Sequence, residues 1–276
     1  MSDGSGALKN LSTHFAFGEN WASYAVTIDA ARIAEAKKGL ARLIGEGELA
    51  GKSFLDIGCG SGLHSLAASL LGASRIVAFD IDPQAVETTR AVLRAHAPAL
   101  VFDAQAFSVF DLTPQAFGPF DVVYSWGVLH HTGAMHEALT KAAAVVAPGG
   151  LFAFALYRRT RMCGFWRIEK RWYSHASPRA QHAARAAYTQ LMRLAFLATG
   201  RDFHGYVASY QSQRGMNFEH DVHDWMGGYP YESIGAAEVE AFMRTLGYTH
   251  VRSFTRPLSL GLFGSGCDEY VYRRTA

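Results

Sequence analysis

The chain has 276 residues, of which 49% are hydrophobic and 18% are charged, so it is long and apolar enough for one large globular domain and is neither disordered nor fibrous. Its 26 basic and 24 acidic residues give a net charge of +2, which excludes the strongly basic field of a general nucleic-acid binder. Three widely spaced cysteines, no apolar run of membrane-spanning length and no signal-peptide pattern at the N-terminus predict a cytoplasmic protein without a disulfide framework or a structural metal.

The predicted elements begin with a helix over residues 28–44, where apolar or alanine residues recur at helical spacing and Gly45 follows. Short apolar runs then alternate with helical segments. Strands are predicted at 53–57, 75–79, 107–110, 120–124 and 151–156, and helices at 63–71, from Pro83 onward and at 135–146. Five strands alternating with helices predict an α/β fold with a doubly wound parallel sheet.

The alternation stops between Arg158 and Glu232 and resumes with a predicted helix at 238–246 and strands at 249–254 and 268–272. The simplest architecture is one Rossmann-like domain with a mainly helical insertion, or cap, between its fifth strand and its last helix. We expect four parts, which are an N-terminal helical lid segment (1–50), a cofactor-binding core (51–157), the cap (158–232) and the C-terminal part of the core sheet (233–276).

A glycine-rich turn, Gly58-Cys59-Gly60-Ser61-Gly62, follows the first predicted strand and opens a helix. Glycines there let the backbone turn tightly and approach a ligand beside helix N-terminal amides. Asp80 ends the second strand twenty residues after Gly60, and its carboxylate can accept both hydroxyl hydrogens of a ribose. Dinucleotide dehydrogenases share such turns but usually have Gly or Ala three residues after the second glycine, where this chain has Leu63.

The same motifs, in this order and spacing, resemble those of the class I S-adenosylmethionine-dependent methyltransferases. The matching segments are 56–62, 78–83, 120–123, 128–131 and 147–150. The resemblance implies a seven-stranded sheet whose last strand is antiparallel, with S-adenosylmethionine as the cofactor. It implies that Gly58 and Gly60 pass the methionine moiety, that Asp80 binds the ribose and that the turn after the third strand borders the adenine.

The residues expected to bind the cofactor by this resemblance are Asp56, Gly58, Gly60, Asp80, Ile81, Ser108, Val109 and Ser125, joined by Trp21 and Tyr24 of the N-terminal segment. Asp111 is an alternative to Ser108 and Val109 at the adenine. The stretch Trp126-Gly127-Val128-Leu129-His130-His131-Thr132-Gly133 further resembles a bacterial subgroup of the family. This resemblance extends over the chain through similarities at 17–21, 214–216, 224–232 and 266–269. It does not imply a particular reaction or acceptor.

The residues after the fourth strand bear on the chemistry, because in this fold they face the methyl group. Ser125-Trp126-Gly127-Val128 differs from the Asn/Asp-Pro-Pro-aromatic pattern of enzymes that methylate nucleobases. No acidic residue that could hold a divalent ion occurs between Tyr124 and Met135. We therefore expect a metal-independent reaction. His130 and His131 are the first candidates for a general base, with hydrogen bonding to the cofactor or helix capping as the alternative. Tyr157 and Glu232 are further catalytic candidates.

The predicted cap is strongly basic. Residues 158–201 contain nine arginines and one lysine against a single acid, and Ser177-Pro178 marks the start of an amphipathic helix. This composition is typical of a segment that binds an anionic or lipid-linked acceptor or an RNA. The alternative is a helix whose apolar side covers the core and whose arginine side is only solvated. His220 and His223 have a ligand-type spacing, but a substrate-facing loop is preferred to a metal site. The residues expected to contact the acceptor are Arg214, Trp225, Tyr229 and Tyr231.

The sequence therefore predicts an enzyme that transfers a methyl group from S-adenosylmethionine to a small-molecule acceptor. A hydroxyl acceptor is the first hypothesis, because it benefits most from a nearby histidine base. The alternatives are a nitrogen or sulfur acceptor, an RNA methyltransferase that uses the basic cap, and a cofactor-binding module without turnover. The identity of the acceptor and the oligomeric state are not predicted.

Overall fold

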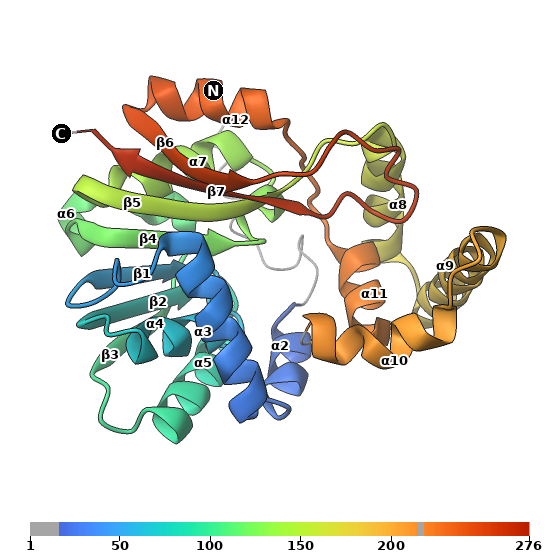
Figure 1. Cartoon of the computed structure of the whole chain (residues 1–276), viewed down its shortest axis with the longest axis horizontal. Helices are drawn as coiled ribbons and strands as arrows, with labels where there is room; N and C mark the ends of the chain where they lie inside the picture. Colours follow the sequence, from blue (N-terminus) through green and yellow to red (C-terminus); the bar gives the residue numbers. More distant parts are fainter. Residues whose placement is uncertain (1–16, 215–217, 276) are drawn as a thin grey trace.

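The computed structural model describes residues 17–214 and 218–275. Its centre is a seven-stranded sheet in the order β3-β2-β1-β4-β5-β7-β6, and β7 runs antiparallel to both of its neighbours (Figure 1). The strands are β1 (Ser53–Ile57), β2 (Arg75–Asp80), β3 (Phe102–Ala106), β4 (Phe120–Trp126), β5 (Val146–Tyr157), β6 (Tyr248–Phe254) and β7 (Cys267–Arg274). The Rossmann-like sheet with an antiparallel last strand is thus confirmed.

Helices cover both faces of the sheet because alternate residues of each central strand point to opposite sides. Leu55 and Ile57 face α7 (Met135–Ala144) and α12 (Ala236–Thr245), whereas Phe54 faces α3 (Ala30–Ile44) and α4 (Leu63–Leu70). Two further helices, α5 (Pro83–His96) and α6 (Pro114–Phe117), complete the two layers. The near-continuous apolar runs of the predicted strands therefore reflect burial on both faces.

The third strand is shifted from its predicted position. The prediction was residues 107–110, but β3 spans Phe102–Ala106, and Val109–Asp111 form the 3-10 helix η2. β3 is an edge strand with one neighbour, so most of its side chains are partly or fully exposed and carry no apolar signal. The apolar run that suggested a strand instead folds inward, because Val109 and Phe110 are buried in the core.

The helix predicted over 135–146 ends earlier, and β5 begins earlier than expected. α7 stops at Ala144, and β5 starts at Val146 and runs through Pro148-Gly149-Gly150, which lies between the predicted helix and the predicted strand. The register with β4 shifts between Phe120 and Val122, so this segment is an irregularity within the ladder. A Cβ at Gly150 would lie 2.8 Å from the carbonyl oxygen of Asp121, so the close strand contact requires glycine.

Four helices between β5 and α12 form the cap, and Figure 1 shows them together beyond the end of β5. They are α8 (Cys163–His175), α9 (Pro178–Ala198), α10 (Phe203–Arg214) and α11 (Phe218–Gly227). α9 starts at the predicted Ser177-Pro178, where the serine hydroxyl accepts the amide of Ala180. The cap has its own apolar core around Tyr173 and Tyr210. Within 17–214 and 218–275, no helix has the length and apolar character needed to cross a membrane.

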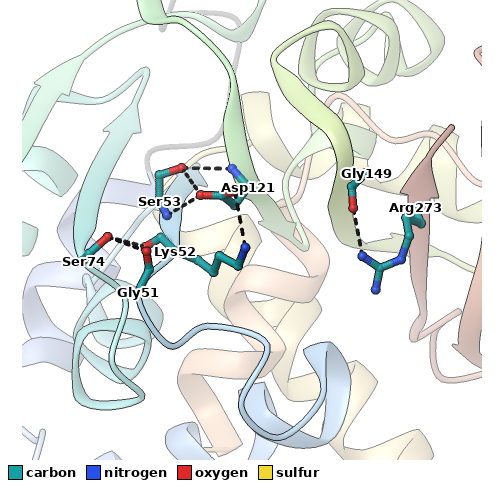
Figure 2. A network of polar contacts seen from close by, with 7 residues as sticks. All are labelled: Gly51, Lys52, Ser53, Ser74, Asp121, Gly149 and Arg273. Atoms are coloured by element: carbon teal, nitrogen blue, oxygen red, sulfur yellow. Dashed lines mark hydrogen bonds and ion pairs between the residues drawn. The ribbon is translucent and has the colours of Figure 1, made fainter. Parts of the chain in front are cut away.

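A polar network ties the strands together at the edge of the sheet where β1 and β4 begin (Figure 2). The carboxylate of Asp121 accepts the backbone amide of Ser53 at 2.9 Å and its hydroxyl at 2.8 Å, and Lys52 Nζ lies 3.8 Å away. The hydrogen bond from the Ser53 backbone is the main cause of the lowered pKa of Asp121. In the same region Arg273 donates to the carbonyl of Gly149 at 2.8 Å. The aspartate of the Phe120–Val123 motif thus joins β4 to β1, away from the glycine-rich turn.

Replacing Asp121 by alanine should lower the free energy of unfolding by about 1 kcal/mol, a modest value because the carboxylate is half-exposed. Since the folded pKa is lowered, this stabilisation is present above the ordinary carboxyl pKa and is lost as the pH falls through the lowered one. Urea unfolding should show the difference at about pH 7 and a smaller one at about pH 3. An equal difference at both pH values would contradict a role for the ionised carboxylate.

Candidate active site

The turn after β1 has the backbone that a close-bound ligand requires. Gly58 and Gly60 have φ values of +76° and +52°, which disfavour residues with a side chain. A Cβ at Gly58 would lie 2.4 Å from the side chain of Val128, which follows β4. A Cβ at Gly60 would lie 3.0 Å from the ring of Trp21. The two predicted glycines are therefore enclosed by the loop after β4 and by the N-terminal helix.

Asp80 stands at the end of β2, beside this turn. Its Oδ2 accepts the amide of Gly60 at 3.1 Å, and its Oδ1 accepts the amide of Asp82 at 3.0 Å. Each oxygen retains a lone pair for a further donor. Burial raises the pKa of Asp80 to about 6, and the backbone hydrogen bonds oppose the rise. The carboxylate is thus oriented before any ligand binds and can accept two ribose hydroxyls.

The other polar residues predicted for the cofactor also hold the local backbone. Asp56 is buried and accepts the hydroxyl of Ser65 at 2.6 Å, and burial raises its pKa to about 7. The hydroxyl of Ser125 donates to the carbonyl of Ile57 at 3.0 Å. Ser108 caps η2 by accepting the amide of Phe110 at 3.3 Å. Their assignment to the cofactor stays a prediction, as it does for Ile81 and for the buried Val109.

The helix α2 (Phe17–Ala25) links the glycine-rich turn to the cap. The amide of Gly18 donates to Asp82 Oδ2 at 3.1 Å, and Trp21 packs on Gly60. On the other side, Asn20 Nδ2 donates to Asp224 Oδ2 of α11 at 2.5 Å. The ring of Tyr24 contacts that of Trp21 at 6.0 Å between centroids. The predicted lid residues Trp21 and Tyr24 therefore lie where a helix could cover the cofactor.

The adjacent histidines His130 and His131 follow β4 in the 3-10 helix η3 (Leu129–His131). Their ring centroids lie 4.4 Å apart. Both rings contact Tyr157, the last residue of β5, at centroid distances of 3.8 and 5.1 Å. Three of the four predicted catalytic residues are thus brought together at the carboxyl ends of β4 and β5, where ligands of open α/β sheets bind.

Hydrogen bonds distinguish the two imidazoles. His130 Nδ1 accepts the backbone amide of Tyr157 at 3.2 Å, so the proton of the neutral ring lies on Nε2. His131 Nδ1 lies 2.8 Å from the carbonyl oxygen of Pro230, which can only accept, so its Nδ1 carries the proton and its Nε2 has the lone pair. Of the two, His131 is the imidazole that can take a proton on Nε2.

His130 is suited to donating a hydrogen bond. It is fully buried, and its Nε2 has no hydrogen-bond partner among the described residues. Burial lowers the pKa of His130 well below its ordinary value, the charges of His131 and Lys170 lower it further, and the backbone of Ala155 opposes the fall. The ring is therefore neutral near pH 7, with an unused N–H donor on Nε2.

Aromatic residues of the cap surround Tyr157. The rings of Trp225 and Tyr231 each lie 5.3 Å from it between centroids. We call His130, His131, Tyr157, Trp225 and Tyr231 the Tyr157 cluster. Burial raises the pKa of Tyr157 well above its ordinary value, so its hydroxyl stays protonated. The structure thus joins two of the four predicted acceptor residues to the candidate catalytic residues.

Glu232 has a structural role. Its amide donates to the carbonyl of His130 at 3.0 Å, and its carboxylate accepts the amide of Met135 at 2.9 Å, in the first turn of α7. Burial raises the pKa of Glu232. The carboxylate therefore caps a helix and fixes the backbone of η3, and its role as an alternative base stays a prediction.

The remaining predicted residues lie elsewhere or outside the described part of the chain. The ring of Tyr229 contacts His175 at the end of α8, at 6.2 Å between centroids. Arg214 is the last residue of α10, and its side chain is outside the described part, as is that of His220. His223 Nδ1 is bound within the cap by Tyr173 and Arg185. Among the described residues, no three His, Cys, Asp or Glu side chains gather as a metal site.

Lys170 of α8 was not predicted as a site residue, yet it lies beside the Tyr157 cluster. It is fully buried, and its Nζ is 3.6 Å from the ring centroid of Trp225 and 5.5 and 6.0 Å from those of Tyr231 and Tyr157. Within the described residues, Nζ has no hydrogen-bond partner. The sequence held one signal, because Lys170 stands between Trp166 and Tyr173 on the buried face of an amphipathic helix.

The surroundings of Lys170 do not compensate the burial of its charge. Burying an ammonium costs several kcal/mol, whereas a desolvated contact with an aromatic face stabilises it by about 2 kcal/mol. Burial accordingly lowers the pKa of Lys170 to about 7, against the opposing charges of Glu169 and Asp224. Burial raises the pKa of both carboxyls to about 7. Burial therefore shifts the pKa of three ionisable groups missed by sequence reasoning toward neutrality.

The fold and the site together define the class of protein. The strand order with an antiparallel β7, the glycine-rich turn after β1 and the carboxylate at the end of β2 are those of a class I S-adenosylmethionine-dependent methyltransferase. The site fits the cofactor, because Asp80 keeps free acceptor sites and the turn at Gly58 and Gly60 presents no side chain. Residues 28–200 match the family model described as Methyltransferase domain, and the chain belongs to this family.

Individual relatives are similar to parts of the chain. It is 39% identical over 118 residues to the ribosomal protein L11 methyltransferase of Azotobacter vinelandii (strain DJ / ATCC BAA-1303), covering 39% of this chain and 35% of that protein. It is 34% identical over 113 residues to the ubiquinone biosynthesis O-methyltransferase of Xanthomonas euvesicatoria pv. vesicatoria (strain 85-10), covering 41% and 46%. The chain thus spans less than half the length of either relative.

Solved structures share the fold over most of the chain. The magnesium protoporphyrin IX methyltransferase of Synechocystis PCC 6803 with bound SAH has a TM-score of 0.52 at 14% identity, covering 89% of this chain and 84% of that one. An S-adenosylmethionine-dependent methyltransferase from Mesorhizobium loti has a TM-score of 0.52 at 16% identity, covering 87% and 98%. At these identities the likeness concerns the fold alone.

Proposed function

We propose that the chain transfers a methyl group from S-adenosylmethionine to an oxygen atom of a small-molecule acceptor, with His131 as the general base. The observation that carries this proposal is the hydrogen bond between His131 Nδ1 and the carbonyl of Pro230, which leaves the lone pair on Nε2. The ring lies at the carboxyl ends of β4 and β5, in contact with Tyr157. A positioned imidazole beside the acceptor is the group that a hydroxyl nucleophile needs.

The bound cofactor supplies an electrophilic methyl group on a sulfonium centre. The chain's own residues align the acceptor and remove its proton. His131 takes the hydroxyl proton on Nε2, and the Pro230 carbonyl stabilises the resulting imidazolium through Nδ1–H. His130 stays neutral and offers its Nε2–H as a donor. We therefore propose His131 alone as the base, whereas the sequence left His130 and His131 as equal candidates.

Residues 158–232 are proposed to form the lid over the acceptor. The support is that Trp225 of α11 and Tyr231 pack on Tyr157, and that Asn20 joins Asp224 to α2. The cap and the carboxyl ends of the strands thus meet at the Tyr157 cluster, and the N-terminal helix contacts the cap beside it, at Asp224. The reaction is proposed to need no metal, because no acidic residue lies between Tyr124 and Met135 on the loop after β4.

The similarity to the Xanthomonas ubiquinone biosynthesis O-methyltransferase supports an oxygen acceptor. The similarity to the Azotobacter L11 methyltransferase favours a protein acceptor as the second candidate. RNA is a further alternative because of the basic segment 158–201, which carries nine arginines and one lysine.

A labelled-donor assay tests the proposal. The purified chain is incubated with S-adenosylmethionine labelled in the methyl group and with separate pools of phenols and alcohols, amines, thiols, ribosomal protein and RNA. We expect label in the hydroxyl pool, in a product stable to mild alkali. Label confined to amines, thiols, protein or RNA would overturn the oxygen acceptor.

A further inference from the structure

Buried polar atoms without hydrogen-bond partners gather at the Tyr157 cluster. Buried polar groups in native proteins are nearly always paired, so each exception needs a reason. Three of the atoms are donors from separate elements, namely His130 of η3, Lys170 of α8 and Trp225 of α11. In the described residues the unpaired atoms here are His130 Nε2, Glu169 Oε1 and Oε2, Lys170 Nζ, Asp224 Oδ1 and Trp225 Nε1.

The donors are close together in space. Lys170 Nζ lies 3.6 Å from the ring centroid of Trp225, and Trp225 and His130 contact the same ring, Tyr157, at 5.3 and 3.8 Å. The side chains that carry an ammonium, an indole N–H and an imidazole N–H thus pack around one tyrosine at the end of β5. Such a set of donors, shielded from water, recognises an oxygen that carries or develops negative charge.

We propose that Lys170, with Trp225 Nε1 and His130 Nε2, binds the reacting oxygen of the acceptor, and that this acceptor is an acidic hydroxyl compound of the phenol or enol class. The inference rests on the proposed oxygen methylation. The hydroxyl proton moves to His131 Nε2, a lone pair of the oxygen forms the bond to the methyl carbon, and the carbon–sulfur bond breaks to leave a neutral thioether. Lys170 exchanges no proton in this step, and its ammonium stabilises the developing oxyanion.

The neighbouring carboxyls allow negative charge to develop on the acceptor oxygen. Asp224 is held through Oδ2 by Asn20, and burial raises the pKa of Asp224 and of Glu169 to about 7. Near neutrality these groups can take up protons as negative charge develops on that oxygen, which limits repulsion. The same charge favours the ammonium form of Lys170, whose pKa burial lowers to about 7. The developing oxyanion therefore takes the place of these carboxylates as the counter-charge of Lys170.

Lys170→Met is the variant that tests the proposal, because it removes the charge and keeps the length and apolar stem of the side chain. Replacing a buried unpaired charge by an apolar group should raise the Tm of the ligand-free protein by at least about 2 °C. The same change should lower kcat/KM for a phenol acceptor by about 100-fold, with S-adenosylmethionine affinity unchanged in calorimetry. A gain in stability together with a loss of activity is what a purely structural lysine would not give.

Lys38→Met, on the exposed part of α3, is the matched control and should change neither quantity. Lys170→Gln, which keeps a neutral donor, is the second variant and should also be impaired. Unchanged kcat/KM in either Lys170 variant, or a lowered Tm in Lys170→Met, would overturn the role of Lys170. A labelled product that releases methanol in alkali would identify a carboxylate acceptor and overturn the hydroxyl class. If His131→Asn is inactive while the Lys170 variants are unimpaired, this inference fails and the proposed function stands.

The outer face of α8 supports a second, independent inference. Phe165, Ile168 and Trp172 recur there at helical spacing, and their side chains are 54%, 73% and 52% exposed. The connection between β6 and β7 lies beside the start of this helix (Figure 1), where the amide of Met162 donates to the carbonyl of Leu260 at 3.1 Å. This connection adds the exposed side chains of Leu258, Leu260 and Leu262.

Basic residues are interspersed among these apolar ones. Arg161, Arg167 and Arg171 are exposed at the start and along the outer side of α8. Segment 158–201 carries nine arginines and one lysine against one acid. Exposed aromatic and aliphatic side chains among arginines are the pattern of helices that lie in a bilayer interface, and the charge complements anionic headgroups.

We infer that the outer face of α8 and the β6–β7 connection dock on the surface of an anionic bilayer. The full chain should sediment with vesicles that contain phosphatidylglycerol and less with pure phosphatidylcholine vesicles, and added salt should release it. The triple variant Phe165→Ser, Ile168→Ser and Trp172→Ser should bind at least about tenfold less.

The matched control replaces Val26 and Val101, which are exposed directly after α2 and directly before β3, by serine and should bind like the unchanged chain. Equal binding by the triple variant and the unchanged chain would overturn the docking surface. The docking surface would also be overturned if the unchanged chain bound no vesicles and formed a dimer in light scattering that the triple variant does not form. That result would assign the face to a second copy of the chain.

Discussion

Replacing His131 by asparagine should lower kcat by about 100-fold or more, with little change in S-adenosylmethionine affinity. The asparagine amide can still donate to the carbonyl of Pro230, as His131 Nδ1 does at 2.8 Å, so the loop is retained. What the variant lacks is the proton acceptor at Nε2. Steady-state kinetics on an oxygen acceptor, with calorimetry for the cofactor, measure the two quantities separately.

His136→Asn is the matched control, because His136 is exposed on α7 and its ring packs on that of Phe242 at 4.8 Å between centroids. It should retain full turnover. His130→Asn should behave differently from His131→Asn, since it removes the Nε2–H donor without removing the base. Full turnover in His131→Asn would show that the acceptor is already deprotonated or that another group takes its proton.

Replacing Asp80 by alanine should weaken S-adenosylmethionine binding by about 1–3 kcal/mol, or about 5- to 150-fold in Kd. The two carboxylate oxygens are held by the amides of Gly60 and Asp82 at 3.1 and 3.0 Å, so the unchanged chain presents a pre-oriented acceptor. Calorimetry on a variant shown to be folded by circular dichroism measures the effect. Asp103→Ala, at an exposed position of β3, should leave Kd unchanged. Unaltered affinity in Asp80→Ala would mean that the ribose binds elsewhere.

The same carboxylate predicts a pH dependence. Burial raises the pKa of Asp80 to about 6, and only the ionised form accepts two hydroxyl hydrogens. Cofactor affinity should therefore be full above this pKa and should fall as the pH decreases through about 6. Asp80→Asn cannot titrate there and should show a flat profile over the same range. A parallel decline in both proteins would assign the pH dependence to another group.

Local sequence determined the elements with strong burial or strong turn chemistry. The strands around Leu55, Val77 and Val123 are apolar on both faces and were found within about a residue or two. Glycines with positive φ and Asp80 at a strand end marked the cofactor site. Both features depend on the local backbone, a tight turn and the end of a strand, and are therefore visible in the sequence. The edge strand β3 was displaced, since a strand with one neighbour buries too little to show a hydrophobic pattern.

Tertiary structure alone decided the chemistry of the site. His130 and His131 are equivalent in the sequence, and they differ only because one ring meets the amide of Tyr157 and the other meets the carbonyl of Pro230, ninety-nine residues away. Lys170 reads as one more basic residue of the cap until α8 turns it inward onto Trp225. Hydrogen-bond partners, burial and pKa depend on contacts between residues distant along the chain. The sequence by itself therefore determined the methyltransferase fold and its cofactor turn, whereas the fold decided which side chains become base, donor and buried charge.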